Sequence, residues 1–191
     1  MKISTVPRVF AITWTVMAIT LFLSPESRAD SSTEFSGYIS LDTRIFPRTD
    51  IHTGQDRQFI NPSLVIEPEI YHEWNEGDDS ITFIPFARID AQDDERTHVD
   101  FRELNYFHIA ENWDISVGFD KVFWGVTESR HLVDIINQTD AVEDVDGEDK
   151  LGQPMINLGF QRDWGNINLF LMPFFRERTF PGKEGRLRSS L

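Results

Sequence analysis

The sequence predicts an all-β protein, an antiparallel transmembrane β-barrel whose sheet is incomplete, with about seven long amphipathic strands. Three observations lead to this fold class. Apolar and polar residues alternate through seven segments after residue 29, the connections between these segments alternate between short and long, and aromatic residues gather near segment ends. A strict period of two is the pattern of a β-strand with one apolar face.

The N-terminal segment resembles a secretory signal peptide. The cations Lys2 and Arg8 precede an apolar stretch over residues 9–23, and Ser-Arg-Ala follows at residues 27–29. A positive start, an apolar centre and a small-x-small site are typical of a signal peptide, here cleaved after Ala29. A membrane anchor is the alternative, but the apolar run is shorter than the roughly 20 residues of a spanning helix. We therefore predict a signal peptide over residues 1–29 and a barrel segment over residues 30–191.

Composition excludes several classes of function. Without residues 1–29 the chain has 15 basic and 31 acidic residues, a formal charge of −16. Such a field disfavours nucleic-acid binding. Cysteine is absent, which excludes disulfides, thiol catalysis and thiolate metal sites. The five histidines have no H-E-x-x-H spacing and no G-x-S-x-G is present, so we predict no enzyme, no metal and no cofactor.

The first four predicted strands cover residues 35–46, 63–74, 81–91 and 99–109. Several exceed the five or six residues that are usual in soluble proteins. Their apolar sides comprise Phe35, Gly37, Ile39, Leu41, Thr43 and Ile45; Leu64, Ile66, Pro68, Ile70 and Trp74; Ile81, Phe83, Pro85, Ala87, Ile89 and Ala91; and Val99, Phe101, Phe107 and Ile109. In the fourth strand the alternation is irregular, because Glu103 and Asn105 interrupt the apolar side and Leu104 falls on the polar side.

The last three predicted strands cover residues 113–123, 155–162 and 167–178. Their apolar sides comprise Trp113, Ile115, Val117 and Phe119; Ile156, Leu158 and Phe160; and Ile167, Leu169, Leu171, Pro173 and Phe175. Pro68, Pro85 and Pro173 fall inside predicted strands, where proline removes a ladder donor and favours edges or bulges.

The connections predict which ends of the strands face which compartment. Residues 75–79, 110–113 and 163–166 are tight turns rich in Gly, Asn and Asp. The alternate connections, residues 47–61, 92–97 and 125–153, are polar, and two of them are long. Tight periplasmic turns and longer external loops are typical of outer-membrane barrels. Within the last loop, residues 128–136 predict a short helix that either narrows the pore or lies on the surface.

Aromatic side chains near the predicted strand ends favour a membrane over a soluble core. Barrels concentrate rings at the two membrane interfaces, although aromatics are also common in any strand. The residues are Phe35, Phe46, Trp74, Trp113, Phe123, Trp124 and Trp164. A soluble periplasmic β-sandwich that binds carbohydrate remains the alternative, because alternation alone does not distinguish a lipid-facing side from a buried side.

Residues 99–140 resemble a porin-like family of bacterial outer-membrane barrels related to the alginate-export type. That family joins a strand-turn-strand of VDLREAY…WDLRLG type to a following WG…D-x-x-N-x-x-D, and the matching residues here are Arg102, Glu103, Trp113, Asp114, Gly118, Trp124, Gly125, Asp134, Asn137 and Asp140. Residues 169–182 resemble the family's strand that ends in a Pro-Gly loop. The resemblance implies an outer-membrane channel. Because single-chain bacterial barrels use even strand numbers, we expect this chain to be the N-terminal part of a larger barrel.

Alternation predicts which side chains line the pore. We expect the lining to include Asp42, Arg44, Glu67, Glu69, Glu73, Arg88, Asp90, Asp100, Arg102, Asp114 and Asp120, with Arg130 and Asp134 added if the last loop enters the pore. Acids outnumber bases among them, which favours cations or polyols. The alternative is that these residues form structural ion pairs between strands.

The acidic run in the last loop permits two interpretations. Asp140, Glu143, Asp144, Asp146, Glu148 and Asp149 form the run. Calcium binding is disfavoured, because Val142 and Gln153 would occupy ligand positions of the loop. A solvated external loop, bridged to lipopolysaccharide by divalent ions, is the preferred interpretation.

The predicted function is passive transport or export of small polar solutes across the bacterial outer membrane. Its predicted partners are outer-membrane lipid and lipopolysaccharide, and a homo-oligomer is left open. A barrel lipase would require a serine and a histidine within hydrogen-bonding reach. The candidate pairs are Ser129 with His131, and Ser116 or Ser36 with His108.

Overall fold

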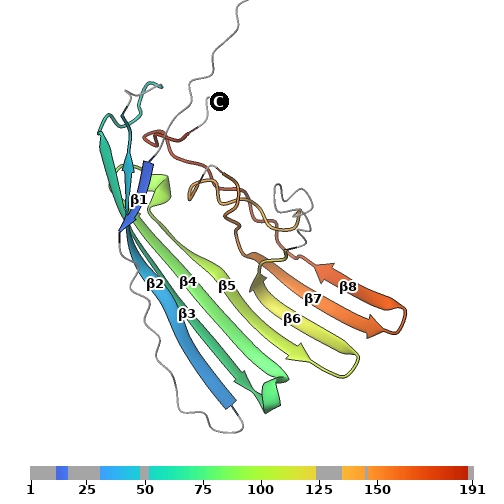
Figure 1. Ribbon diagram of the computed structural model, residues 1–191. Coiled ribbons are helices and arrows are strands. Elements are labelled where there is room, and N and C mark those ends of the chain that lie inside the picture. The colour runs from blue at the N-terminus through green and yellow to red at the C-terminus, as the bar shows by residue number, and fades with distance from the viewer. Residues whose placement is uncertain (1–11, 17–30, 48–51, 124–134, 145, 189–191) are drawn as a thin grey trace, which may run out of the picture.

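The computed structural model describes residues 12–16, 31–47, 52–123, 135–144 and 146–188. All its strands form one antiparallel sheet in which each strand pairs with its neighbours in sequence. The strands are β1 (Ile12–Val16), β2 (Ser31–Ile45), β3 (Ile60–Trp74), β4 (Asp79–Asp90), β5 (His98–Ile109), β6 (Trp113–Asp120), β7 (Gln153–Arg162) and β8 (Gly165–Leu171). Figure 1 shows an open, twisted sheet. Among the described residues, no helix has the length and apolar character needed to span a bilayer.

The predicted strands are confirmed as β2 to β8, with two shorter than expected. The strand predicted over residues 113–123 ends at Asp120, because the side chain of Asn137 takes the place of a neighbouring strand. It accepts from Val122 N at 2.8 Å and donates to Asp120 O at 2.8 Å. The strand predicted over residues 167–178 ends at Leu171, since Pro173 has no backbone donor and the chain leaves the sheet.

Strand β1 lies inside the predicted signal peptide. It pairs antiparallel with residues 41–45 of β2, while residues 1–11 and 17–30 lie outside the described residues. If cleavage follows Ala29, β1 is removed, and the sheet of the mature protein runs from β2 to β8.

Short and long connections lie at opposite ends of the sheet, as predicted (Figure 1). Residues 75–78, 110–112 and 163–164 make the short turns, and residues 46–59, 91–97 and 121–152 make the longer connections. We call these the turn end and the loop end. The short helix predicted over residues 128–136 falls mostly outside the described residues.

At the loop end, the polar side of the sheet is the buried side. Register places the apolar side chains of the strands on one surface, the outer face, where these are exposed: Phe35, Ile39, Leu41, Ile60, Leu64, Ile66, Ile81, Ile89, Val99, Phe101, Leu104, Val117, Ile156, Ile167, Leu169 and Leu171. The opposite surface, the inner face, carries most of the polar side chains together with the buried Val65, Phe86 and Met155, and residues 135–144 and 146–152 lie over its loop end. A β-sandwich would bury the outer face under a second sheet, but in the described part of the chain every strand belongs to the one sheet. The described residues therefore contain no second sheet that would cover the outer face.

A bulge in β5 corrects the predicted faces of that strand. Pro85 pairs with Phe101, but Ile84 pairs with Glu103, so Arg102 is the extra residue. One extra residue reverses the faces of everything that follows. Leu104 and Tyr106 consequently lie on the outer face, whereas Phe107 pairs with Ser116 on the inner face. The irregular alternation in the sequence was the signal of this bulge.

Two of the strand prolines lie opposite each other. The β3–β4 ladder has the same register at Ile66–Ala87 and at Ile70–Phe83. This register places Pro68 opposite Pro85. Neither residue can donate a ladder hydrogen bond. On the other side of β3, Gly37 has φ +127°, and a Cβ there would lie 2.6 Å from the Cα of Pro68. A glycine is therefore needed beside Pro68.

Candidate functional site: a charged cavity on the inner face

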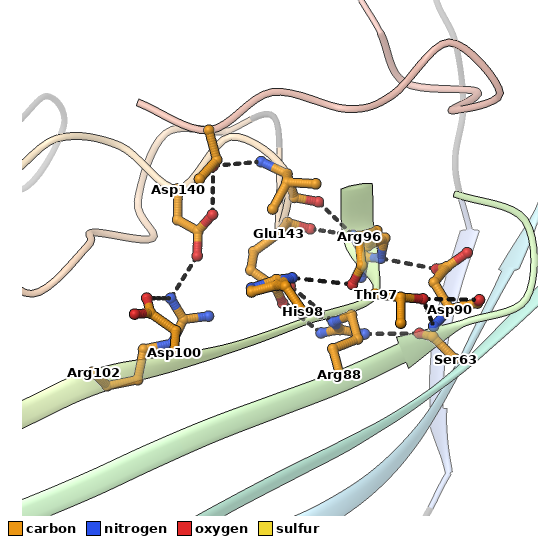
Figure 2. Close-up of polar contacts among 12 residues, drawn as sticks. Ser63, Arg88, Asp90, Arg96, Thr97, His98, Asp100, Arg102, Asp140 and Glu143 are labelled. Atoms are coloured by element: carbon orange, nitrogen blue, oxygen red, sulfur yellow. Dashed lines mark hydrogen bonds and ion pairs between the residues drawn. The ribbon is translucent and has the colours of Figure 1, made fainter. Parts of the chain in front are cut away.

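A charged cavity of about 290 Å³ lies at the loop end of the inner face. Strands β2 to β5 form its floor, and residues 135–144 and 146–152, which we call the covering loop, form its roof and one side. The lining residues are Tyr38, Asp42, Arg44, Glu67, Phe86, Arg88, Arg96, Arg102, Lys121, Glu143, Asp144, Asp149 and Lys150. Figure 2 shows arginines of the sheet converging on Glu143 and Asp140 of the covering loop.

Arg88 and Glu143 form the central contact of the cavity. The Nε of Arg88 donates to both carboxylate oxygens of Glu143 at 2.9 Å, and its Nη2 lies 2.6 Å from Oε2. Its Nη1 donates to Asp42 at 2.9 Å and to Ser63 at 2.7 Å. Arg88 is 7% exposed and Glu143 6%. Because a buried charge is stable only when paired and hydrogen-bonded, this contact fixes the covering loop to β4.

Two further arginines hold the main chain of the covering loop. Arg44 Nη2 donates to Glu143 O at 2.6 Å. Arg96 Nη1 donates to Glu143 O at 2.6 Å and to Val142 O at 2.9 Å, while its Nε lies 3.1 Å from Asp90. Burial, together with the charges of Arg44 and Arg88, lowers the pKa of Arg96 to about 10. Arg96 therefore still carries its charge at neutral pH.

The β5 bulge directs the side chain of Arg102 to Asp140, which is the second residue that attaches the covering loop to the sheet. Its guanidinium lies 3.8 Å from the ring centroid of Phe86 and bonds the carboxylate of Asp140, which is fully buried. Thr179 Oγ1 donates to the other oxygen of that carboxylate. A guanidinium stacked on a ring and paired with a carboxylate is held in one orientation.

Apolar and amide contacts complete the attachment of the loop. Val142, Leu151 and Met155 are almost fully buried. Asn137 donates to Leu151 O at 2.9 Å, and Leu151 N donates to Gln138 O at 2.9 Å. The covering loop is thus packed against the inner face as well as paired with it. The interpretation of the acidic run as a solvated external loop is wrong for Asp140 and Glu143.

The structure brings together five of the predicted lining residues: Asp42, Arg44, Glu67, Arg88 and Arg102 line the cavity. Asp90 and Asp100 lie at its edge, paired with Arg96 at 3.1 Å and Arg102 at 3.7 Å.

The remaining predicted residues lie elsewhere. Glu69 and Glu73 accept from Ser36 at 3.1 Å and Ser32 at 3.0 Å, nearer the turn end. Asp114 pairs in register with Gly159, and Asp120 accepts from Ser116 at 3.0 Å. Arg130 and Asp134 fall outside the described residues.

Several cavity residues were missed by sequence reasoning. Arg96 lies in the short η2 turn (Asp94–Arg96), where strand alternation does not apply. Phe86 was assigned to no site, although it provides the ring beneath Arg102. Lys121 and Lys150 come from the ends of the last long connection. A basic residue directly flanking an acidic run was the available signal for Lys150.

Neither serine proposed to pair with His108 reaches it. His108 lies on the outer face, where its Nδ1 is 2.8 Å from Asp79. Ser116 and Ser36 lie on the inner face, where they donate to Asn105 and Glu69 respectively. These two pairs are wrong, and Ser129 with His131 lies outside the described residues. In the described part of the chain, no three acidic or histidine side chains converge in a way that could hold a metal ion.

Comparison with protein-family models, with curated proteins and with solved structures found no match. The resemblance of residues 99–140 to porin-like barrels therefore remains a prediction.

Proposed function

We propose that this protein forms part of a porin-like β-barrel in the bacterial outer membrane, through which small polar solutes pass passively. One observation carries the proposal: the outer face is apolar and uncovered along the strands, while the charged side chains at the loop end of the inner face are buried. Soluble proteins bury apolar side chains and expose charged ones. A barrel around a wet pore does the reverse.

The arrangement of connections and aromatic residues supports the same orientation. Rings cluster on the outer face at the turn end. The ring centroids of Trp74 and Tyr106 are 6.1 Å apart in a stacked arrangement, and those of His108 and Trp113 are 5.3 Å apart. Tyr106 also donates to Asp79 at 2.6 Å. Aromatic side chains with a polar group favour the membrane interface, so the turn end would be periplasmic and the loop end external.

The proposal requires that the open sheet be closed in the membrane. Hydrocarbon offers no partners to the unpaired N–H and C=O groups of a sheet edge. The free edge of β8 must therefore pair with a further strand. Removal of β1 with the signal peptide would expose an edge of β2, and this edge must also pair with a further strand. The covering loop would narrow the resulting pore beside the 290 Å³ cavity. The acids of that cavity are largely paired with arginines, so we expect passage of small neutral polyols.

Fractionation and reconstitution test the proposal. The protein should pellet with outer membranes, stay insoluble after osmotic shock, and require detergent for extraction. Liposomes that contain it should swell in a small polyol faster than protein-free liposomes. Release by osmotic shock without detergent would contradict the membrane location, and a membrane-bound protein that leaves liposomes impermeable would contradict the transport function alone.

A further inference from the structure

A segment without regular secondary structure crosses the loop end of the inner face. Residues 172–188 follow β8 and run from the β8 edge of the sheet to the connection between β2 and β3 (Figure 1). We call this segment the strap. It carries five basic and two acidic residues in a chain whose formal charge is −14. The strap is therefore attracted electrostatically to the acidic loops that it crosses.

The strap begins with contacts to β7 and β5. Arg176 Nη1 donates to Gly152 O at 2.8 Å, and its Nη2 pairs with Asp100. Gln153 donates to Phe174 O. These contacts tie the start of the strap to the same strand ends that carry the covering loop.

The middle of the strap binds the covering loop itself. Thr179 forms a parallel bridge with Asp140. Its hydroxyl donates to the carboxylate of Asp140 and accepts from Val142 N at 3.2 Å. Thr179 thus contacts the residue that Arg102 anchors, and the residue next to Glu143. Removing these bonds would leave the buried Asp140 carboxylate with one partner fewer.

The end of the strap is pinned to two other connections. Gly182 N donates to both oxygens of Asp93, at 3.0 and 3.2 Å. Asp56 N donates to Glu184 O at 3.0 Å, and Gln55 donates to Gly185 O at 3.1 Å. The fit around Asp93 is close, because a Cβ at Gly182 would lie 2.6 Å from Asp93 Oδ1 and one at Gly185 would lie 2.3 Å from Oδ2.

We propose that the strap is a releasable latch that holds the covering loop in the pore, so that release of residues 172–188 opens the charged cavity. This inference rests on the proposed channel function. The geometry supports it, because the strap contacts the covering loop at Asp140, Val142 and Gly152 but ends on different connections. Loss of the Thr179 contacts can therefore loosen the loop without removing an arginine partner, whereas Asp93 also caps the η2 turn that carries Arg96.

Single cysteines report whether the covering loop is docked, since the native chain contains none. Val142→Cys places a thiol at a position that is 3% exposed, and Leu151→Cys provides a second reporter at 2%. In the full-length protein in bilayers, we would measure the rate of reaction with a water-soluble thiol reagent. Thr179→Val removes the hydroxyl contacts of the strap, and Gly182→Ala and Gly185→Ala each add a Cβ that would displace the Asp93 carboxylate from the strap. Lys183→Ala, an exposed residue between the two glycines, is the matched control.

Release of the strap should increase thiol labelling about tenfold, equivalent to about 1.4 kcal/mol, in Gly182→Ala and Thr179→Val but not in Lys183→Ala. Labelling should also rise with salt, because the strap and the loops attract each other electrostatically. The time that the channel spends open in planar bilayers should increase in the same variants.

The two readouts separate the failure of the strap from that of the channel. Labelling rates that stay at the wild-type value in both Gly182→Ala and Thr179→Val would overturn the latch, even if the protein conducts. Faster labelling with unchanged conductance would overturn gating by the strap. A folded protein that conducts in no variant would overturn the channel function, and gating with it, whatever the labelling rates.

Discussion

Glu143 shows how one side chain organises the candidate site. Its carboxylate binds Arg88, its carbonyl accepts from Arg44 and Arg96, and its side chain is 6% exposed. In sequence it is one member of an acidic run with no feature that separates it from its neighbours. Burial makes the difference, because removing one partner of a buried ion pair leaves an uncompensated charge.

Glu143→Gln should therefore destabilise the folded protein by about 3–5 kcal/mol, because Arg88 keeps its charge and loses its main partner. Glu148→Gln removes an exposed carboxylate from the same loop and should change the free energy of unfolding by less than about 0.5 kcal/mol. Thermal unfolding of detergent-solubilised protein, followed by circular dichroism, measures both. Equal effects of the two substitutions would show that Glu143 is not specifically paired.

The β5 bulge is the element that decides which side chains of β5 lie on the inner face. It inserts Arg102 between the pairs Pro85–Phe101 and Ile84–Glu103, and so directs both Arg102 and Glu103 to the inner face. It also occurs opposite Pro85, where the ladder already lacks a donor. A regular β5 would place Phe107 outside and Leu104 inside.

Lysine substitutions on the two faces of β5 test this register in a membrane. Leu104 is exposed on the outer face and Phe107 lies on the inner face. Leu104→Lys should impair membrane insertion by about 2–4 kcal/mol if it faces the bilayer centre, whereas Phe107→Lys should insert. Recovery of folded, protease-resistant protein from membranes measures insertion. If Leu104→Lys inserts and Phe107→Lys does not, β5 follows the regular alternation of the sequence and the bulge is contradicted.

At the scale of the whole molecule, the two faces of the sheet are inverted relative to a soluble protein. The exposed apolar side chains occur on every strand from β2 to β8, and the buried ones gather beneath the covering loop. In the proposed membrane location the outer face would meet an apolar solvent, which would make this arrangement favourable. The inner face keeps its charges because the covering loop and the strap supply their partners.

Spin labels on β3 would identify the solvent of each face. A label at Ile66→Cys, on the outer face, should be more accessible to dissolved oxygen than to a water-soluble nickel chelate, because oxygen concentrates in lipid tails. A label at Glu69→Cys, on the inner face of the same strand, should show the reverse. Greater access of the nickel chelate to the outer position would contradict the membrane location.

The sequence by itself determined the number, order and approximate extent of the strands β2 to β8, and the apolar side of each except the part of β5 that follows its bulge. These features are local, since a period of two and turn residues such as those at 75–78 act within a few positions. Only the tertiary structure decided the single open sheet, the bulge at Arg102, and the burial of Asp140 and Glu143. Each depends on groups far apart in the chain: the pairing of Arg88 with Glu143 spans 55 residues, and that of Thr179 with Asp140 spans 39. Local pattern carries no information about which distant charge will neutralise a carboxylate, and burial is determined by that partner.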